Sequence, residues 1–449
     1  MTAEAGPDAT LDSTVGDALE AGLDQAVAEA GPDATIVDAA PDVSPDASGD
    51  AGSCIAKIFG DHYLRTDGKL FYAANGLHTL VIDAATSAPL VGVTELVQQG
   101  NDHACGLRND GTVWCWSLTS GGGNTNGDLG NGVVGGTTFA VGAATQVVTD
   151  AADAGAPVYL TSVSHLSTPS GVLGTFPTCA IRSDKTVWCW GDSAAQVGSN
   201  DGLFWGTTGS VAGVPYAIPI AAAPAGGGPP PTLHADQVSI GARHACLLLS
   251  GSVSCWGQNI AGNLADGDST LAFKAYPTPI VSGLGLPATV DSIGSGYDYS
   301  CALAGGSVWC WGSNYWGQIG NPSVPPSICN ANYCKPTPTP VQASAPDGGT
   351  TLVPDAGTDQ NPLSGMASLV VGYEFGCGVD SAGTMWCWGA DNAGLTLLAV
   401  ATPYTSTTLP YSNVTALTVI GTAINGSLRY TTASGAYISG NHQYTPYCL

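Results

Sequence analysis

The residues with the clearest capacity for chemistry in this chain are its 14 cysteines, which could form disulfides, bind a metal ion or act as nucleophiles. Ten of them form five local pairs, each on either side of a short turn. These pairs are Cys105/Cys115, Cys179/Cys189, Cys246/Cys255, Cys301/Cys310 and Cys377/Cys387. The pairs lack the C-x2-C spacing of structural zinc sites, and no cysteine has a His base placed to activate a nucleophile. Five disulfides are therefore predicted.

The spacing within each pair follows the length of its turn. Three hairpins have three-residue loops and cysteines 10 residues apart, whereas two have two-residue loops and cysteines 9 apart. The longer loops centre on Asp110, Asp184 and Ala382, and the shorter loops are Ser250-Gly251 and Gly305-Gly306. This compensation keeps the two sulfurs opposite each other across the hairpin, which a cross-strand disulfide requires.

Tryptophans flank the second cysteine in four of these hairpins, and each faces Gly, Ala, Ser or Thr on the partner strand. They are Trp114, Trp116, Trp188, Trp190, Trp309, Trp311, Trp386 and Trp388. A small residue opposite an indole lets the ring lie across its neighbour strand and pack on the next sheet. These tryptophans are thus expected to form a core between sheets, not a ligand-stacking site.

The hairpin belongs to a longer repeat. Five clear copies, such as HACGLRNDGTVWCW at 103–116, are each followed by a tail such as NYWGQIG at 314–320. Degenerate copies at 63–75 and 427–441 bring the total to seven, with anchors at 72, 115, 189, 255, 310, 387 and 439. All-β units of this size cannot bury both faces alone, so we expect an all-β, seven-bladed β-propeller of four-stranded blades over 54–449. A linear β-solenoid is the rival architecture.

The four remaining cysteines bear on this choice. Cys329 and Cys334 lie within ICNANYC and are predicted to pair locally. Cys54 precedes the first copy and Cys448 is the penultimate residue. A Cys54–Cys448 disulfide requires the ends to meet, as they do in a closed ring, so it is predicted to be the clasp of the propeller.

The composition excludes several functions. Lys and Arg number 10 and Asp and Glu 35, a formal net charge of −25, and only 10% of residues are charged. A mostly helical protein with Glu/Lys pairs along its surface is excluded, and binding to nucleic acid or anionic lipid is not expected. The sequence contains no 18-residue apolar run, so no transmembrane segment is predicted.

Residues 1–53 are predicted to be a disordered Asp/Ala/Gly-rich tether. They hold twelve of the acidic residues, no Lys or Arg and no aromatic residue, and they repeat AGPDAT at 5–10 and 30–35. Such a segment cannot bury a core and extends by charge repulsion. The rest of the chain then has 23 acidic and 10 basic residues, a net charge of −13.

The repeats resemble a known family. QGNDHACGLRNDGTVWCW at 99–116 and SIGARHACLLLSGSVSCWGQNIAGNLADG at 239–267 are similar to the repeat of the regulator of chromosome condensation family. Members of that family are seven-bladed propellers. They include a nucleotide-exchange factor for a small GTPase, chromatin-binding proteins and secreted bacterial β-lactamase inhibitors. The cysteine pairs and the acidity of this chain argue against the nuclear roles.

We found no catalytic, cofactor or metal site, and an enzyme is not expected. The motifs of serine hydrolases, zinc proteases and phosphate loops are missing from the sequence. NDGTVW and SDKTVW are similar to the Asp-box of sialidases, but the five arginines do not form the required cluster. His103 and His244 share one repeat position, where a hydrogen bond to backbone within the blade is expected.

These observations favour an exported, monomeric scaffold for binding or adhesion that recognises a protein or a cell-surface polymer through its rim loops. One alternative, implied only by the family resemblance, is a guanine-nucleotide-exchange-like regulator of a small GTPase. A second is a cryptic glycan hydrolase or lyase.

Disulfides indicate an oxidising, extracellular, cell-surface or periplasmic location, although the chain as given shows no signal peptide. The acidic tether is similar to the spacer of bacterial surface lipoproteins.

Overall fold

The computed structural model describes strands and connecting loops between Ile55 and Tyr444. The described residues are 55–59, 61–74, 77–100, 102–120, 124, 126–135, 139–149, 156–169, 177–192, 213–222, 231–267, 273–281, 286–322, 327–329, 332–343, 362–390, 397–403, 414–419, 428–432, 435–438 and 442–444. The chain divides into two units, Met1–Ser44 and Pro45–Leu449, and all described residues belong to the second. The predicted tether at 1–53 lies outside them. Regular structure in the described residues is entirely β, as expected from the composition.

Four sheets are four-stranded meanders in chain order. Their strands are β1 (Ile55–Phe59), β2 (His62–Arg65), β3 (Leu70–Ala74) and β4 (Leu77–Leu80); β16 (Gln237–Ile240), β17 (His244–Leu249), β18 (Ser252–Gln258) and β19 (Phe273–Pro279); β25 (Met366–Val371), β26 (Phe375–Asp380), β27 (Met385–Ala390) and β28 (Leu397–Pro403); and β29 (Val414–Val419), β30 (Leu428–Thr432), β31 (Gly435–Ile438) and β32 (His442–Tyr444).

Three further sheets add short strands to the same antiparallel four-stranded core. The first has β6 (Val93–Gln99), β7 (His103–Arg108), β8 (Val113–Ser117) and β9 (Ala143–Gln146) with β5 (Ile82–Asp83). The second has β12 (Val163–Ser167), β13 (Pro177–Arg182), β14 (Val187–Gly191) and β15 (Val214–Pro219) with β10 (Val148–Thr149) and β11 (Val158–Tyr159). The third has β20 (Ser292–Ser295), β21 (Tyr299–Ala304), β22 (Ser307–Ser313) and β24 (Asn332–Pro340) with β23 (Ser327–Cys329).

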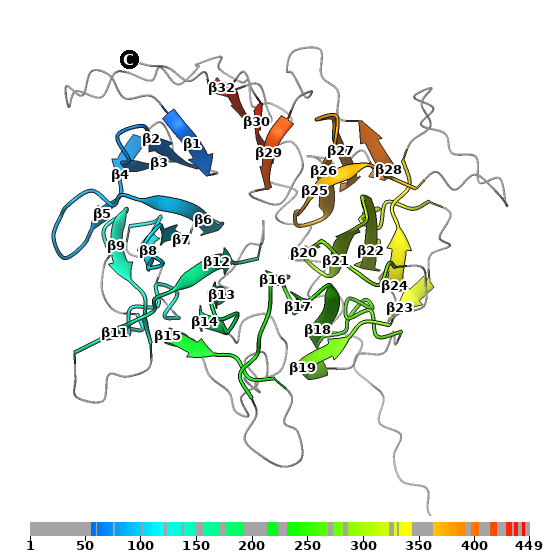
Figure 1. The fold of residues 1–449 in the computed structure, drawn as a ribbon, viewed down its shortest axis with the longest axis horizontal. Helices are drawn as coiled ribbons and strands as arrows, with labels where there is room; N and C mark the ends of the chain where they lie inside the picture. The colour runs from blue at the N-terminus through cyan, green and yellow to red at the C-terminus, as the bar shows by residue number, and fades with distance from the viewer. Residues whose placement is uncertain are drawn as a thin grey trace, which may run out of the picture. The chain divides into compact units, whose positions relative to one another are not determined.

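The sheets are arranged around a common centre as a β-propeller (Figure 1). Their first strands contact one another in chain order, from β1 to β6 and on through β12, β16, β20, β25 and β29. The second strands β7, β13, β17 and β26 are buried along almost their whole length. Burial on both faces is expected for a strand that lies between two neighbouring sheets.

The five hairpin disulfides are present, as predicted. They join Cys105–Cys115, Cys179–Cys189, Cys246–Cys255, Cys301–Cys310 and Cys377–Cys387. The two-residue loops also match the prediction, because Leu249 pairs with Ser252 and Ala304 with Ser307. Cys334 is disulfide-bonded, whereas the side chain of Cys329, and Cys54 and Cys448, lie outside the described part of the chain.

Four of the eight tryptophans form the core between sheets, as predicted, and the other four, Trp114, Trp188, Trp309 and Trp386, are partly buried against the same clusters. Trp116, Trp190, Trp311 and Trp388 are fully buried, and each belongs to a cluster of residues from the preceding sheet. The indole N–H groups of Trp190, Trp311 and Trp388 donate to the backbone oxygens of Asp128, Asn263 and Gln318, at 3.2, 3.1 and 3.0 Å. These acceptors lie in the repeat tails, so each tail fixes the indole of the next sheet.

The expectation for His103 and His244 was wrong. Nε2 of His244 lies 2.7 Å from the hydroxyl of Ser300, and Nε2 of His103 lies 3.3 Å from the hydroxyl of Thr178. Both hydroxyls belong to the next sheet, not to the histidine's own blade. The histidines begin the second strand of their sheets, where the side chain reaches across the interface between sheets, and that geometry decides the partner.

The first copy replaces its disulfide with two rings. His62 pairs with Tyr72 across the β2–β3 hairpin, at the register where other copies pair cysteines, and their ring centroids are 4.9 Å apart. Burial lowers the pKa of His62 to about 4. The neutral ring accepts a hydrogen bond from the indole N–H of Trp116 at 3.1 Å. The two strands of this hairpin therefore pack together without a covalent bridge, and the His62 ring also joins the next sheet through Trp116.

Candidate binding site

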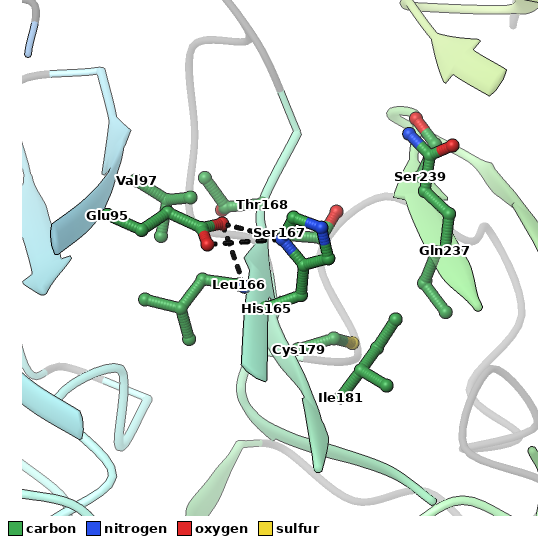
Figure 2. A pocket seen from close by; sticks show the side chains of 11 residues that line it. Glu95, Val97, His165, Leu166, Ser167, Thr168, Cys179, Ile181, Gln237 and Ser239 are labelled. Atoms are coloured by element: carbon green, nitrogen blue, oxygen red, sulfur yellow. Dashed lines mark hydrogen bonds and ion pairs between the residues drawn. The ribbon is translucent and has the colours of Figure 1, made fainter. Parts of the chain in front are cut away.

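A cavity of about 230 Å³ lies between three neighbouring sheets and is lined mainly by their first strands, together with β13 (Figure 2). Its lining residues are Glu95, Val97, His165, Leu166, Ser167, Thr168, Cys179, Ile181, Gln237, Val238 and Ser239. Strand β6 contributes Glu95, β12 contributes His165 and β16 contributes Gln237. The cavity thus combines apolar walls with carboxylate, imidazole, hydroxyl and amide groups, a combination typical of sites that bind small polar groups.

The three longest polar side chains of the cavity occupy one repeat position. Val97, Ser167 and Ser239 each lie opposite the first cysteine of their hairpin. Glu95, His165 and Gln237 stand two residues earlier in the same strands. Because side chains two residues apart share a face of a strand, the repeat places these groups at equivalent points of the three sheets.

In two cases this position connects the first strand of one sheet to the first strand of the next. The carboxylate of Glu95 accepts a hydrogen bond from the backbone N–H of Leu166 at 3.0 Å. The amide of Gln237 accepts from the N–H of Ile293 at 2.9 Å and donates to its carbonyl at 2.8 Å. Leu166 and Ile293 occupy equivalent points of β12 and β20, so one side-chain position joins two pairs of sheets in the same way.

Glu95 also contacts the imidazole of His165, a titratable group of the cavity whose pKa is shifted. Nδ1 of His165 lies 3.1 Å from the carboxylate, and Figure 2 shows the two side chains pointing toward each other from β6 and β12. The hydrogen bond to Glu95 raises the pKa of His165. The His165 side chain is 58% exposed and that of Glu95 29%, so solvent screening keeps the pair weak.

We expect the raised pKa of His165 to depend on Glu95. In a Glu95→Gln variant the glutamine still accepts from Leu166, but the pKa of His165 falls back toward its ordinary value of about 6.5. Since a raised pKa means that the folded state holds the proton more tightly, the stabilisation is complete below about pH 6.5 and is lost as the pH rises through the folded pKa. Histidine NMR titration of both proteins measures the difference; an unchanged His165 titration would contradict the assignment.

The sequence did not indicate these cavity residues. It singled out Cys179 only as a disulfide partner, and the first strands of the sheets lack the Cys and Trp residues that mark the hairpins. Aligning VTELVQQ at 93–99 with QVSI at 237–240 from the hairpin register would have placed Glu95 with Gln237. Within the described ranges, no group of three His, Cys, Asp or Glu residues could hold a metal ion.

The repeat and the fold both have counterparts among known proteins. A family model described as the regulator of chromosome condensation (RCC1) repeat matches residues 96–127. Prp20p from Saccharomyces cerevisiae has a similar structure, with 15% identity, a TM-score of 0.52, and coverage of 83% of this chain and 80% of Prp20p. Human WBSCR16 shows 16% identity and a TM-score of 0.47 over 75% of this chain and 70% of its own.

No curated protein matches the sequence. The likeness to Prp20p supports an RCC1-like propeller fold, in agreement with the resemblance of the repeats. In the part of the chain that the structure describes, no helix is long and apolar enough to cross a membrane.

Proposed function

We propose that this protein is an exported, seven-bladed propeller that acts as a binding or adhesion scaffold, recognises a protein or a surface polymer, and carries out no catalysis. The observation that carries the proposal is the disulfide in each of five successive hairpins. Repeated cross-strand disulfides persist where the surroundings are oxidising, as outside the cytoplasm.

The contacts between sheets support a rigid scaffold. Buried indoles, the His103 and His244 contacts, and the Gln237 amide all join one sheet to the next. Loops carried by such a scaffold are held in position at little entropic cost, which favours recognition. Ring closure between the first and last sheets, with Cys54–Cys448 as its clasp, completes the proposal.

Cell fractionation and peptide mapping under non-reducing conditions test the proposal together. We expect the protein outside the cytoplasm, with the five hairpin disulfides intact and with one peptide linking Cys54 to Cys448. Recovery from the cytoplasm with free thiols would overturn export. A free thiol at Cys54 or Cys448 in an exported protein would overturn the clasp alone.

A second candidate is a regulator of a small GTPase with exchange-like activity. The observation that favours it is the structural likeness to Prp20p, whose structural study also describes its binding to Gsp1p and histones. Release of a fluorescent guanine nucleotide from a small GTPase, accelerated by the purified protein, would support this candidate. The net charge of −25 argues against binding of nucleic acid and favours basic proteins as partners.

A further inference from the structure

Five aromatic side chains gather at one end of two neighbouring sheets and form what we call the aromatic surface. Its members are Tyr297, Tyr315, Trp316, Tyr333 and Tyr373, with Arg243 and Glu374 beside them. Most of these residues lie in loops that follow the first or third strand of their sheets. In an antiparallel meander the loops after the first and third strands emerge at the same end of the sheet. This explains how residues distant in the sequence meet.

Contacts make this surface continuous. The guanidinium of Arg243 lies 4.9 Å from the Tyr297 ring, and the rings of Tyr297 and Tyr373 are 4.6 Å apart. Tyr315 lies 4.9 Å from Trp316 and 6.2 Å from Tyr333, measured between ring centroids. The side chains of Trp316 and Glu374 are hydrogen-bonded, and this contact joins the two aromatic groups.

The fold does not require these rings to be exposed. Tyr315 is 55% exposed and Tyr333 47%, whereas the tryptophans that hold the sheets together are fully buried. Tyr, Trp and Arg side chains contribute much of the binding energy at protein interfaces, and Tyr and Trp bury large areas with little loss of rotamer freedom. The composition of the aromatic surface therefore matches that of a binding surface.

Its charges indicate the partner. Arg243 pairs with Asp298 at 3.0 Å, so the one guanidinium here is already neutralised. Burial raises the pKa of Glu374 to about 7, and among the described residues Glu374 forms no ion pair. Aromatic faces attract cations, as Arg243 over Tyr297 illustrates, and the net charge of −13 outside the tether attracts basic partners over longer range.

We propose that the aromatic surface docks a basic segment of a partner protein, whose lysine or arginine side chains lie on the exposed tyrosine rings and pair with Glu374. This inference deepens the proposed binding function by assigning a surface and a partner chemistry to it.

A fluorescent peptide of sequence Gly-Lys-Gly-Arg-Gly-Lys-Gly tests the inference against the full chain in about 150 mM salt, where long-range attraction is screened beyond about 8 Å. Fluorescence anisotropy compares wild type with a Tyr315→Ala/Tyr333→Ala double variant and with Glu374→Gln. Tyr159, 44% exposed and in another sheet, supplies the matched control Tyr159→Ala. We expect the double variant to bind about tenfold more weakly, and the control to bind within about twofold of wild type.

Equal affinity of wild type and the double variant would overturn the inference, because the tether or another acidic region would then hold the peptide. Loss of chitohexaose binding in the double variant, with peptide binding unchanged, would also overturn it and assign the surface to a glycan. Neither outcome depends on the disulfides or on the location of the protein. Failure of this inference is therefore distinguishable from failure of the proposed export. Since Tyr315, Tyr333 and Tyr159 are exposed, circular dichroism should show the double variant and the Tyr159→Ala control folded.

Discussion

Replacing Cys301 and Cys310 together by alanine lowers the free energy of unfolding by about 2–4 kcal/mol, the effect of a disulfide that closes a short loop. The two residues are 9 apart and face each other in the middle of the β21–β22 hairpin, with both sulfur-bearing side chains fully buried. The disulfide restricts the unfolded chain, and the buried cysteines also fill space between sheets. Chemical denaturation of the variant and of wild type measures the loss.

The same reasoning predicts a larger effect of complete reduction. Five disulfides in separate hairpins contribute nearly additively, and their sum of about 10–20 kcal/mol is comparable to or larger than the total stability of about 5–15 kcal/mol typical of folded proteins. We therefore expect the protein to unfold when it is reduced under mild denaturation, as followed by tryptophan fluorescence. The Tyr159→Ala variant, which changes an exposed side chain, serves as the control for the alanine substitutions. Full stability after verified reduction would contradict the prediction.

This dependence links the energetics to the proposed location. A propeller whose hairpins need oxidation to remain folded cannot operate in a compartment that keeps thiols reduced. The first hairpin shows that the fold has another solution, since His62 and Tyr72 occupy the cysteine register without a covalent bond. The repeated use of cysteine in five other hairpins is consistent with an oxidising environment.

The hairpins could be predicted from the sequence because their residues identify their own register. A cysteine can bridge only to a cysteine opposite, so the spacing of Cys246 and Cys255 determines both the pairing and the turn length. An indole likewise needs a small residue across the strand, as Trp388 does at Gly376. These two independent constraints determine the register of each hairpin. The repetition of the hairpin along the chain then predicts a β-propeller.

The cavity could not be predicted in the same way, because its residues have no obligatory partner. Glu95 and His165 are 70 residues apart, and a carboxylate or an imidazole is satisfied by many neighbours. The wrong expectation for His103 and His244 has the same cause: a histidine can bond to backbone or to a hydroxyl, and only the geometry between sheets selects Ser300 or Thr178. Contacts between sheets depend on how the units stack, which the pattern of one repeat does not contain.

Trp388→Ala is expected to lower the free energy of unfolding by about 3–5 kcal/mol, the cost of removing a large buried aromatic side chain. Trp388 is fully buried among residues of the preceding sheet, including Ile319 and Val341, and its indole N–H donates to the backbone oxygen of Gln318 at 3.0 Å. The substitution removes packing between two sheets and leaves a buried carbonyl without its donor. Thermal and urea unfolding measure the loss.

A double-mutant cycle with Gly376 makes this prediction specific to the interface. A Cβ atom added at Gly376 would overlap the Trp388 indole, so Gly376→Ala in the wild-type background should destabilise by about 1–3 kcal/mol. In the Trp388→Ala background the same methyl group enters space that the indole has vacated, and its cost should fall toward zero. Equal costs in the two backgrounds would show that the strand tolerates a side chain at Gly376 regardless of the indole, and would contradict the packing of Trp388 against its small partner as the reason for the glycine.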